Sequence, residues 1–166
     1  MLVVADASPL HYLILIEHVE VLQSLYGTIT VPPIVLTELR RPQAPQAVRT
    51  WLAHLPAWVE VRAPHTPLSL ELQHLGAGER DAILLAQALH ADLILLDDQK
   101  GRQAAHQRAL TVMGTLGVLE RASISGLLDL PTAITRLQAS NFRIHPEIIQ
   151  ELLERDAARQ RDLRGR

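Results

Sequence analysis

The sequence contains no cysteine and very few aromatic residues. The absence of cysteine excludes disulfide bonds, catalytic thiols and thiolate zinc sites. Aromatic residues make up 3% of the chain, which disfavours the recognition of nucleic-acid bases by ring stacking. No hydrophobic run approaches the ~18 residues of a membrane-spanning helix, and the first residues lack the basic segment of a signal peptide. These absences predict a soluble cytoplasmic domain.

Positive charge is also limited. The 16 Lys and Arg residues face 18 Asp and Glu residues, so no overall positive field attracts nucleic acid, although a bound metal ion would supply positive charge locally. The eight histidines show no zinc-binding spacing, and the motifs of serine hydrolases and of P-loop nucleotide-binding proteins are missing. With 166 residues, 48% of them hydrophobic, the composition is typical of one globular domain.

Short hydrophobic segments alternate with helical patterns along the chain. The expected strands are 2–6, 28–31, 58–61, 93–96 and 110–113. The expected helices are 8–17, 19–26, 34–39, 44–54, 69–75, 79–90, 99–109, 115–122, 131–140 and 146–163. Gly76-Ala-Gly78 should interrupt the chain before the helix 79–90. The alternation predicts an α/β fold with a parallel sheet, followed by a helical C-terminal extension.

Two of the expected strands end at acidic residues. Asp6 follows the first strand, and Asp97 and Asp98 follow the fourth. A buried carboxylate is costly unless it is paired or binds a metal, and sites in parallel sheets form at the carboxyl ends of the strands. Asp6 would otherwise cap the next helix, but Ser8 is better placed as that cap. Neighbouring strand residues point to opposite faces, so we take Asp98 as the first choice for a site and Asp97 as the second.

Three more acids lie in expected helices. Glu38 alone would be an ordinary exposed charge, and only the other acids make it a candidate. Glu79 and Asp81 open the helix 79–90, where the helix dipole favours acids, but they lie ~200° apart around the helix. Asp81 shares a face with hydrophobic residues, so we assign Asp81 to the site and Glu79 to capping or an outer role. The set that favours a cage for a hard divalent cation is Asp6, Glu38, Asp81 and Asp98.

Basic residues are concentrated at two positions. Lys100 and Arg102 begin the helix 99–109, where the helix dipole disfavours cations, so they either bind a phosphate or form a salt link with Asp97 or Asp98. The C-terminus holds a second group, which is either a frayed, solvated tail or a contact for RNA or a partner. Its members are Arg155, Arg159, Arg161, Arg164 and Arg166.

Four segments, in this order, resemble the PIN-domain nucleases. They are Asp6-Ala-Ser8-Pro-Leu, Val31-Pro-Pro-Ile-Val-Leu-Thr-Glu38-Leu, Gly78-Glu-Arg-Asp81-Ala-Ile-Leu-Leu-Ala and Leu95-Leu-Asp97-Asp98. Their order and spacing are similar to those of the VapC-type toxin ribonucleases. Leu116-Gly-Val-Leu and Asn141-Phe-Arg-Ile-His-Pro-Glu resemble a PIN subfamily whose substrates are poorly defined. Many relatives have Thr or Ser two places before the last acid, where this chain has Leu96.

The resemblance implies a three-layer α/β/α PIN-like domain at residues 1–125 and a helical extension at 126–166, packed on that domain. It implies an endoribonuclease that uses Mg²⁺ or Mn²⁺ and acts as the toxin of a type II toxin–antitoxin pair. The implied partners are an RNA substrate, a small antitoxin and a second copy in a homodimer, with no membrane. The catalytic and metal-binding residues would be Asp6, Glu38, Asp81 and Asp98, with secondary roles for Ser8, Glu79 and Asp97.

Two other hypotheses are open. A catalytically idle PIN-like module would bind RNA or a protein without cutting, and an absence of metal binding would favour it. A phosphoacceptor receiver domain also combines an acidic pocket with a lysine. Its pair of acids follows the first strand, however, whereas the pair Asp97 and Asp98 comes late in this chain.

Overall fold

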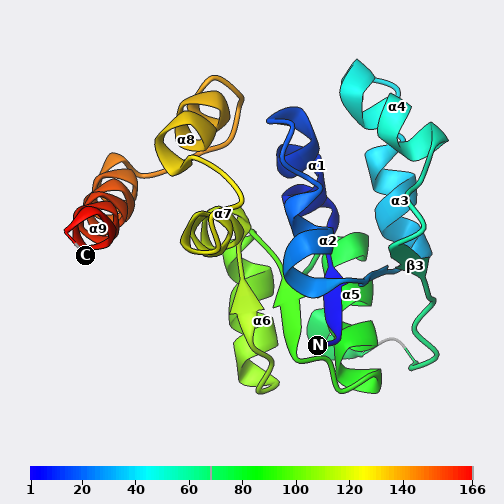
Figure 1. Ribbon diagram of the computed structural model, residues 1–166. Coiled ribbons are helices and arrows are strands. Elements are labelled where there is room, and N and C mark those ends of the chain that lie inside the picture. The colour runs from blue at the N-terminus through cyan, green and yellow to red at the C-terminus, as the bar shows by residue number, and fades with distance from the viewer. Residues whose placement is uncertain (68, 166) are drawn as a thin grey trace. The chain divides into compact units, whose positions relative to one another are not determined.

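The computed structural model describes residues 1–67 and 69–165 (Figure 1). Contacts along the chain divide it into an N-terminal unit, Met1–Thr115, and a C-terminal unit, Leu116–Arg166. The sequence placed this division after residue 125. Arg166, one of the C-terminal arginines noted above, lies outside the described residues.

The N-terminal unit is built on a parallel sheet. Its strands are β1 (Val3–Ala5), β2 (Ile29–Val31), β3 (Val59–Val61), β4 (Leu93–Leu95) and β5 (Val112–Met113). Within the described residues they form one sheet in the order β3-β2-β1-β4-β5, and every pair of neighbours is parallel. The chain thus builds outward from β1 in both directions. The point between β1 and β4, where the strand order reverses, is the usual place for a site in such a sheet.

Helices cover both faces of this sheet (Figure 1). The helices of the N-terminal unit are α1 (Ala7–Leu15), α2 (Val21–Tyr26), α3 (Pro33–Leu39), α4 (Gln46–Ala53), α5 (Ala77–Ala88) and α6 (Gln99–Gln107). Val4, Ile94 and Leu96 point to the face on which α5 and α6 pack, and they are fully buried there. In Figure 1, α1 and α2 lie on the other face. The predicted three-layer α/β/α fold with a parallel sheet is confirmed.

The C-terminal unit is helical, as expected. Its helices are α7 (Thr115–Ile124), α8 (Leu130–Gln138) and α9 (Pro146–Arg164). Asp156 of α9 is 4% exposed and accepts a hydrogen bond of 2.8 Å from the Ser123 hydroxyl of α7. Arg159 bridges Asp156 and Glu120 with ion pairs of 3.1 and 3.3 Å. Among the described residues, no helix is long and hydrophobic enough to cross a membrane.

Three local predictions were wrong. The helix predicted for 69–75 is reduced to a 3₁₀ turn at Leu70–Leu72, which is enough to bury Leu72. The break predicted at Gly76-Ala-Gly78 ends earlier, at Gly76, because α5 begins at Ala77, so Gly78 lies in its first turn. Ser8 does not cap α1: the helix begins at Ala7, and Asp6 occupies the N-cap position without a side-chain cap hydrogen bond.

Candidate active site

Asp6 is a buried carboxylate at the carboxyl end of the central strand β1. It is 4% exposed, and among the described residues its Oδ1 is buried without a hydrogen-bond partner. The pKa of Asp6 is raised from 3.8 to about 7, chiefly by burial. The backbone N–H of Ala7 opposes this increase, and the negative charges of Glu79, Glu38 and Asp97 add to it. A buried oxygen without a partner costs the fold free energy. Such a group is therefore a candidate for function.

Glu38 reaches the same place from α3. Its Oε1 accepts a hydrogen bond of 3.0 Å from the backbone N–H of Gly78, in the first turn of α5. The N-cap residue of α5, Gly76, has no side chain, so the Glu38 carboxylate satisfies a free N–H group that a cap residue would otherwise bind.

Gly78 permits this arrangement because it has no side chain. A Cβ atom at residue 78 would overlap Glu38 Oε2 and would lie 2.8 Å from Asp6 Oδ1. Both distances are shorter than ordinary van der Waals contact. The two carboxylates therefore approach one point on the backbone of α5, and any larger residue at position 78 would displace them.

Glu79 lies near the acids described above, whereas Asp81 lies beside Arg80. Burial raises the pKa of Glu79, and the charges of Asp98 and Glu38 add to the increase. Glu79 also has the predicted capping role, because its Oε2 accepts a hydrogen bond of 3.1 Å from the Gly76 N–H. The side chain of Asp81 is 23% exposed, and its Oδ1 lies 3.5 Å from Nε of Arg80.

Asp97 is held firmly by hydrogen bonds. Its Oδ2 accepts one from the Ser8 hydroxyl at 2.9 Å and one from the Thr115 hydroxyl at 2.7 Å, and its Oδ1 accepts the Thr115 backbone N–H at 2.7 Å. Thr115 is the first residue of α7, so the carboxylate also lies at a helix N-terminus, where negative charge is favourable. Ser8 thus orients Asp97, which in turn contributes to the raised pKa of Asp6.

Asp98 is exposed and caps α6. Its Oδ2 accepts a hydrogen bond of 2.9 Å from the Gly101 N–H. Its charge contributes to the raised pKa of Glu79, so it lies on the Glu79 side of the group. The sequence ranked Asp98 before Asp97, whereas the structure connects Asp97 to Ser8 and Asp6.

Lys100 and Arg102 were expected either to bind a phosphate or to form a salt link with Asp97 or Asp98, and the salt links are not formed in the described part of the chain. Arg102 Nη1 donates a hydrogen bond of 3.0 Å to the Leu96 carbonyl at the end of β4. Lys100 is exposed. In the part of the chain that the structure describes, neither residue forms an ion pair with Asp97 or Asp98. Phosphate binding by these residues remains a proposal.

The ligand chemistry of this group suits a hard divalent cation. The available donors are carboxylate and hydroxyl oxygens, which Mg²⁺ and Mn²⁺ prefer, and the Asp6 oxygen without a partner is free to bind one. No three His, Asp or Glu side chains of residues 1–67 and 69–165 are grouped closely enough to hold an ion as they stand. Side-chain rotations of the flanking acids would therefore accompany binding.

Two residues of this region were not identified from the sequence. Gly78 contributes its backbone N–H and its lack of a side chain, and the sequence signal was a glycine beside two acids. Thr115 contributes two donors to Asp97, and its only signal was a small polar residue two places after the last strand. Neither signal is distinctive, because both residue types are common where elements begin and end.

The fold is a parallel α/β domain with acidic residues at the carboxyl edge of its sheet. The DUF3368 family model, described as a PIN domain, matches residues 2–157, and the chain belongs to this PIN-domain family. PIN domains are generally nucleases. A solved PilT N-terminus domain protein from the hyperthermophilic archaeon Sulfolobus solfataricus P2 has a similar fold, with a TM-score of 0.50 and 15% identity over 87% of this chain and 100% of that chain. No curated protein matches the sequence.

Proposed function

We propose that this protein is a metal-dependent endoribonuclease that hydrolyses RNA phosphodiester bonds with Mg²⁺ or Mn²⁺. The observation that carries the proposal is Asp6, a buried carboxylate with a raised pKa and an oxygen without a partner, surrounded by other acids. A structural role would leave this costly arrangement unexplained. A cation at this position would neutralise the group.

The residues that would hold the cation are Asp6, Asp81 and Asp98, with Glu79 and Asp97 beside them. When bound, it would polarise the scissile phosphodiester and lower the pKa of the attacking water. Glu38 would act as an outer ligand or as the general base that accepts the proton of that water. Its hydrogen bond from the Gly78 N–H would hold the carboxylate in place for that role. Ser8 and Thr115 would keep Asp97 oriented.

The biological role that we propose is that of the toxin in a type II toxin–antitoxin pair. Membership of the PIN family and the similarity of the four acidic segments to VapC-type ribonucleases support it. Such a toxin would act in the cytoplasm as a homodimer, kept inactive by a small antitoxin. Expression of the chain alone should then arrest growth, and co-expression of a short neighbouring reading frame should relieve the arrest.

A catalytically idle module that binds RNA or a protein is the second candidate. One observation favours it: the acids of the described residues are not grouped as a ready metal site. An idle module would bind no metal and cut no RNA, so the cleavage experiment described next separates the two candidates.

The test is the cleavage of a panel of structured RNAs with Mg²⁺, Mn²⁺ or EDTA. We expect metal-dependent cutting by the wild-type protein and none by Asp6→Asn. The matched control is Asp162→Asn, because Asp162 is an exposed acid of α9 and the substitution makes the same chemical change. Cleavage by Asp6→Asn with unchanged metal dependence would contradict the site, and an inert wild-type protein that binds no metal would favour the idle module.

A further inference from the structure

The segment that follows Glu38 contains no acidic residue before Glu60. In this interval the chain carries Arg40, Arg41 and Arg49, which are all exposed. We call these three residues the arginine patch. The rest of the N-terminal unit is rich in acids, so positive charge is separated from negative charge along this part of the chain.

The arginine patch is unpaired, unlike other arginines of the same unit. Arg62, Arg80 and Arg108 each form an ion pair with an acid, at 3.2, 3.5 and 2.7 Å. Across the described residues, no ion pair involves a member of the patch. Arg49 Nη2 donates to the neutral Gln46 side chain at 2.7 Å. The patch therefore keeps its full charge for a ligand.

Helix packing brings the patch near the acidic site: α3 carries Glu38 and packs on α1, which follows Asp6, and α4 packs on both. Arg40 caps α3 and follows Glu38 by two residues, ~200° around the helix, so the two side chains leave α3 on different sides. Arg41 acts on His11 of α1: burial lowers the pKa of His11, and the charge of Arg41 lowers it further. His11 follows Asp6 by five residues, about 7.5 Å along a helix axis.

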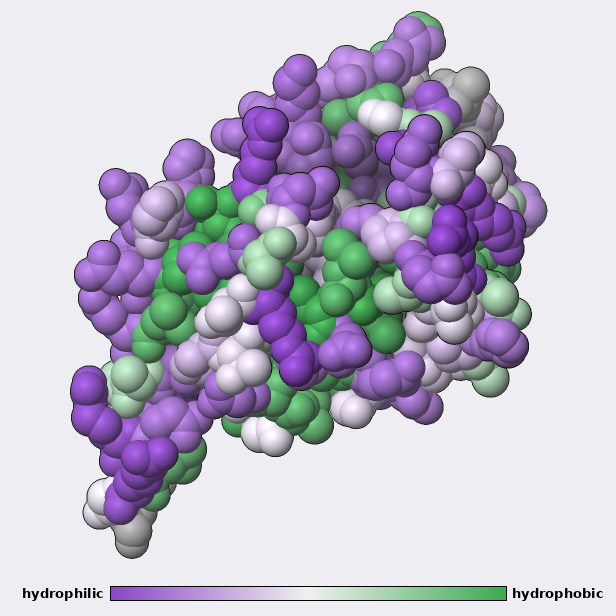
Figure 2. All heavy atoms as spheres, turned by 90° about the horizontal axis from the view of Figure 1, so that it is seen from above, coloured by the Kyte–Doolittle hydropathy of each residue, from purple (hydrophilic) through white to green (hydrophobic). Residues whose placement is uncertain are grey.

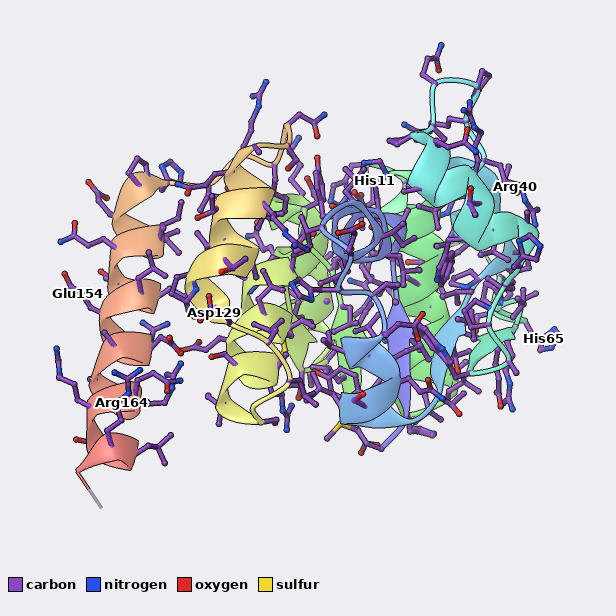
Figure 3. The ribbon with its side chains drawn as sticks, turned by 45° about the horizontal axis from the view of Figure 1, so that its top comes forward. His11, Arg40, His65, Asp129, Glu154 and Arg164 are labelled. Atoms are coloured by element: carbon purple, nitrogen blue, oxygen red, sulfur yellow. The ribbon has the colours of Figure 1, made fainter. Side chains whose placement is uncertain are left out.

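Figures 2 and 3 show the part of the molecule that carries the patch. On the right of Figure 2, the side on which α3 and α4 lie in Figure 1, the surface is mostly hydrophilic. Figure 3 labels His11 on α1 and Arg40 at the end of α3, and these helices are packed against each other, with α4 against both. Cations at the end of α3 also suit the helix dipole. That effect accounts for Arg40 and Arg41 but not for Arg49, which lies inside α4.

We propose that the arginine patch binds the phosphate backbone of a single RNA strand whose scissile bond lies at the acidic site. This inference rests on the proposed function. Arginine suits the role because its guanidinium group binds phosphate oxygens in a bidentate manner. Phosphate contacts position a strand without reading its sequence, which agrees with the scarcity of aromatic residues for base stacking.

The test is a binding measurement in which the RNA is not cut. A patch variant and a control variant are both made in an Asp6→Asn background, which is also their parent. Binding is followed by the fluorescence anisotropy of a fluorescein-labelled 20-nucleotide oligouridine in MgCl₂ over a range of NaCl concentrations. The patch variant is R40Q/R41Q/R49Q. The control is R143Q/R161Q/R164Q, which removes the same charge from exposed arginines of the C-terminal unit that form no ion pair within residues 1–67 and 69–165.

We expect the patch variant to bind RNA at least about tenfold more weakly than its parent. The slope of log K against log[NaCl] should become shallower by about 2, because each phosphate contact contributes roughly 0.7 to that slope for a single strand. The control should retain the affinity and the slope of its parent. Equal losses in both variants, or no binding by the parent protein, would overturn the proposal. The proposed function fails separately if the wild-type protein never cuts RNA while the patch variant still loses binding.

Discussion

Two aspartates, one in each unit of the chain, are buried to the same degree and in opposite ways. Asp6 and Asp156 are each 4% exposed. Asp156 accepts hydrogen bonds from Ser123 at 2.8 Å and from Arg159 at 3.1 Å. Asp6 has other acids as neighbours and a buried oxygen that finds no hydrogen-bond partner in the described part of the chain. Burial alone therefore does not reveal the role of an acid; its partners do.

The difference concerns free energy. A buried charge with a cation and a hydroxyl group beside it is compensated within the fold. A buried carboxylate among like charges is not, and it becomes favourable only when it is protonated or when a cation binds. We therefore expect Asp156 to support its unit and Asp6 to weaken its own.

The largest expected effect is a dependence of stability on pH that comes from Asp6. Below about pH 4 the residue is protonated in the folded and the unfolded chain; between about 4 and 7 only the unfolded chain releases the proton. Stability should thus fall as the pH rises through this window, by on the order of 4 kcal/mol at most. Asp6→Asn should remove this fall, which urea unfolding in EDTA at pH 5 and pH 8 would measure.

Asp162→Asn is the control for that measurement and should follow the wild-type curve. Addition of Mn²⁺ at pH 8 should raise the free energy of unfolding of the wild-type protein and leave Asp6→Asn unchanged, because a ligand of the folded state stabilises it. Parallel pH curves for the wild-type protein and Asp6→Asn would show that Asp6 is compensated in the fold, as Asp156 is.

Gly78→Ala should push the carboxylates of Asp6 and Glu38 apart. The new methyl group would overlap Glu38 Oε2 and crowd Asp6 Oδ1, so we expect a loss of about 2–3 kcal/mol at pH 5 together with loss of metal binding. Gly76→Ala is the control, because its Cβ would lie 3.4 Å from Glu79 Oε2, an ordinary contact. Equal stabilities of the two variants would show that the approach at Gly78 is not tight.

Asp156→Asn tests the other half of the comparison. The amide keeps the shape but loses the charge that Arg159 faces, so we expect the protein to lose about 2 kcal/mol at pH 8, opposite in sign to Asp6→Asn. The loss should remain below that of a fully buried pair because Arg159 is partly exposed and also contacts Glu120. Thermal unfolding of Asp156→Asn and Asp6→Asn at pH 8 shows directly whether each substitution lowers or raises the stability.

Thr115→Val should have the smallest effect. It removes the hydroxyl donor to Asp97 and leaves the backbone donor, so we expect a loss of about 1 kcal/mol. Thr115→Ser keeps the hydroxyl and should restore most of the loss. A full loss in the serine variant would point to packing of the buried methyl group rather than to the hydrogen bond.

The sequence indicated the sheet and the position of Asp6 because a short hydrophobic run that ends in an acid is typical of a buried strand that leads into a site. It ranked Asp98 before Asp97, whereas Asp97 is the residue that Ser8 and Thr115 hold. The distinction depends on where β4 ends and α6 begins, and a shift of one residue reverses the direction of the side chain. Thr115 could not be found because its partner is 18 residues away and is chosen by tertiary packing.

The contact between Glu38 and Gly78 has a consequence for the newly made chain. It joins residues 40 apart, and the contacts of Asp97 reach from Ser8 to Thr115. Before Thr115 emerges from the ribosome, the nascent chain therefore contains the acids, but they are not yet assembled. We expect incomplete chains to lack the assembled group of acids, which forms only when nearly the whole N-terminal unit has emerged and folded.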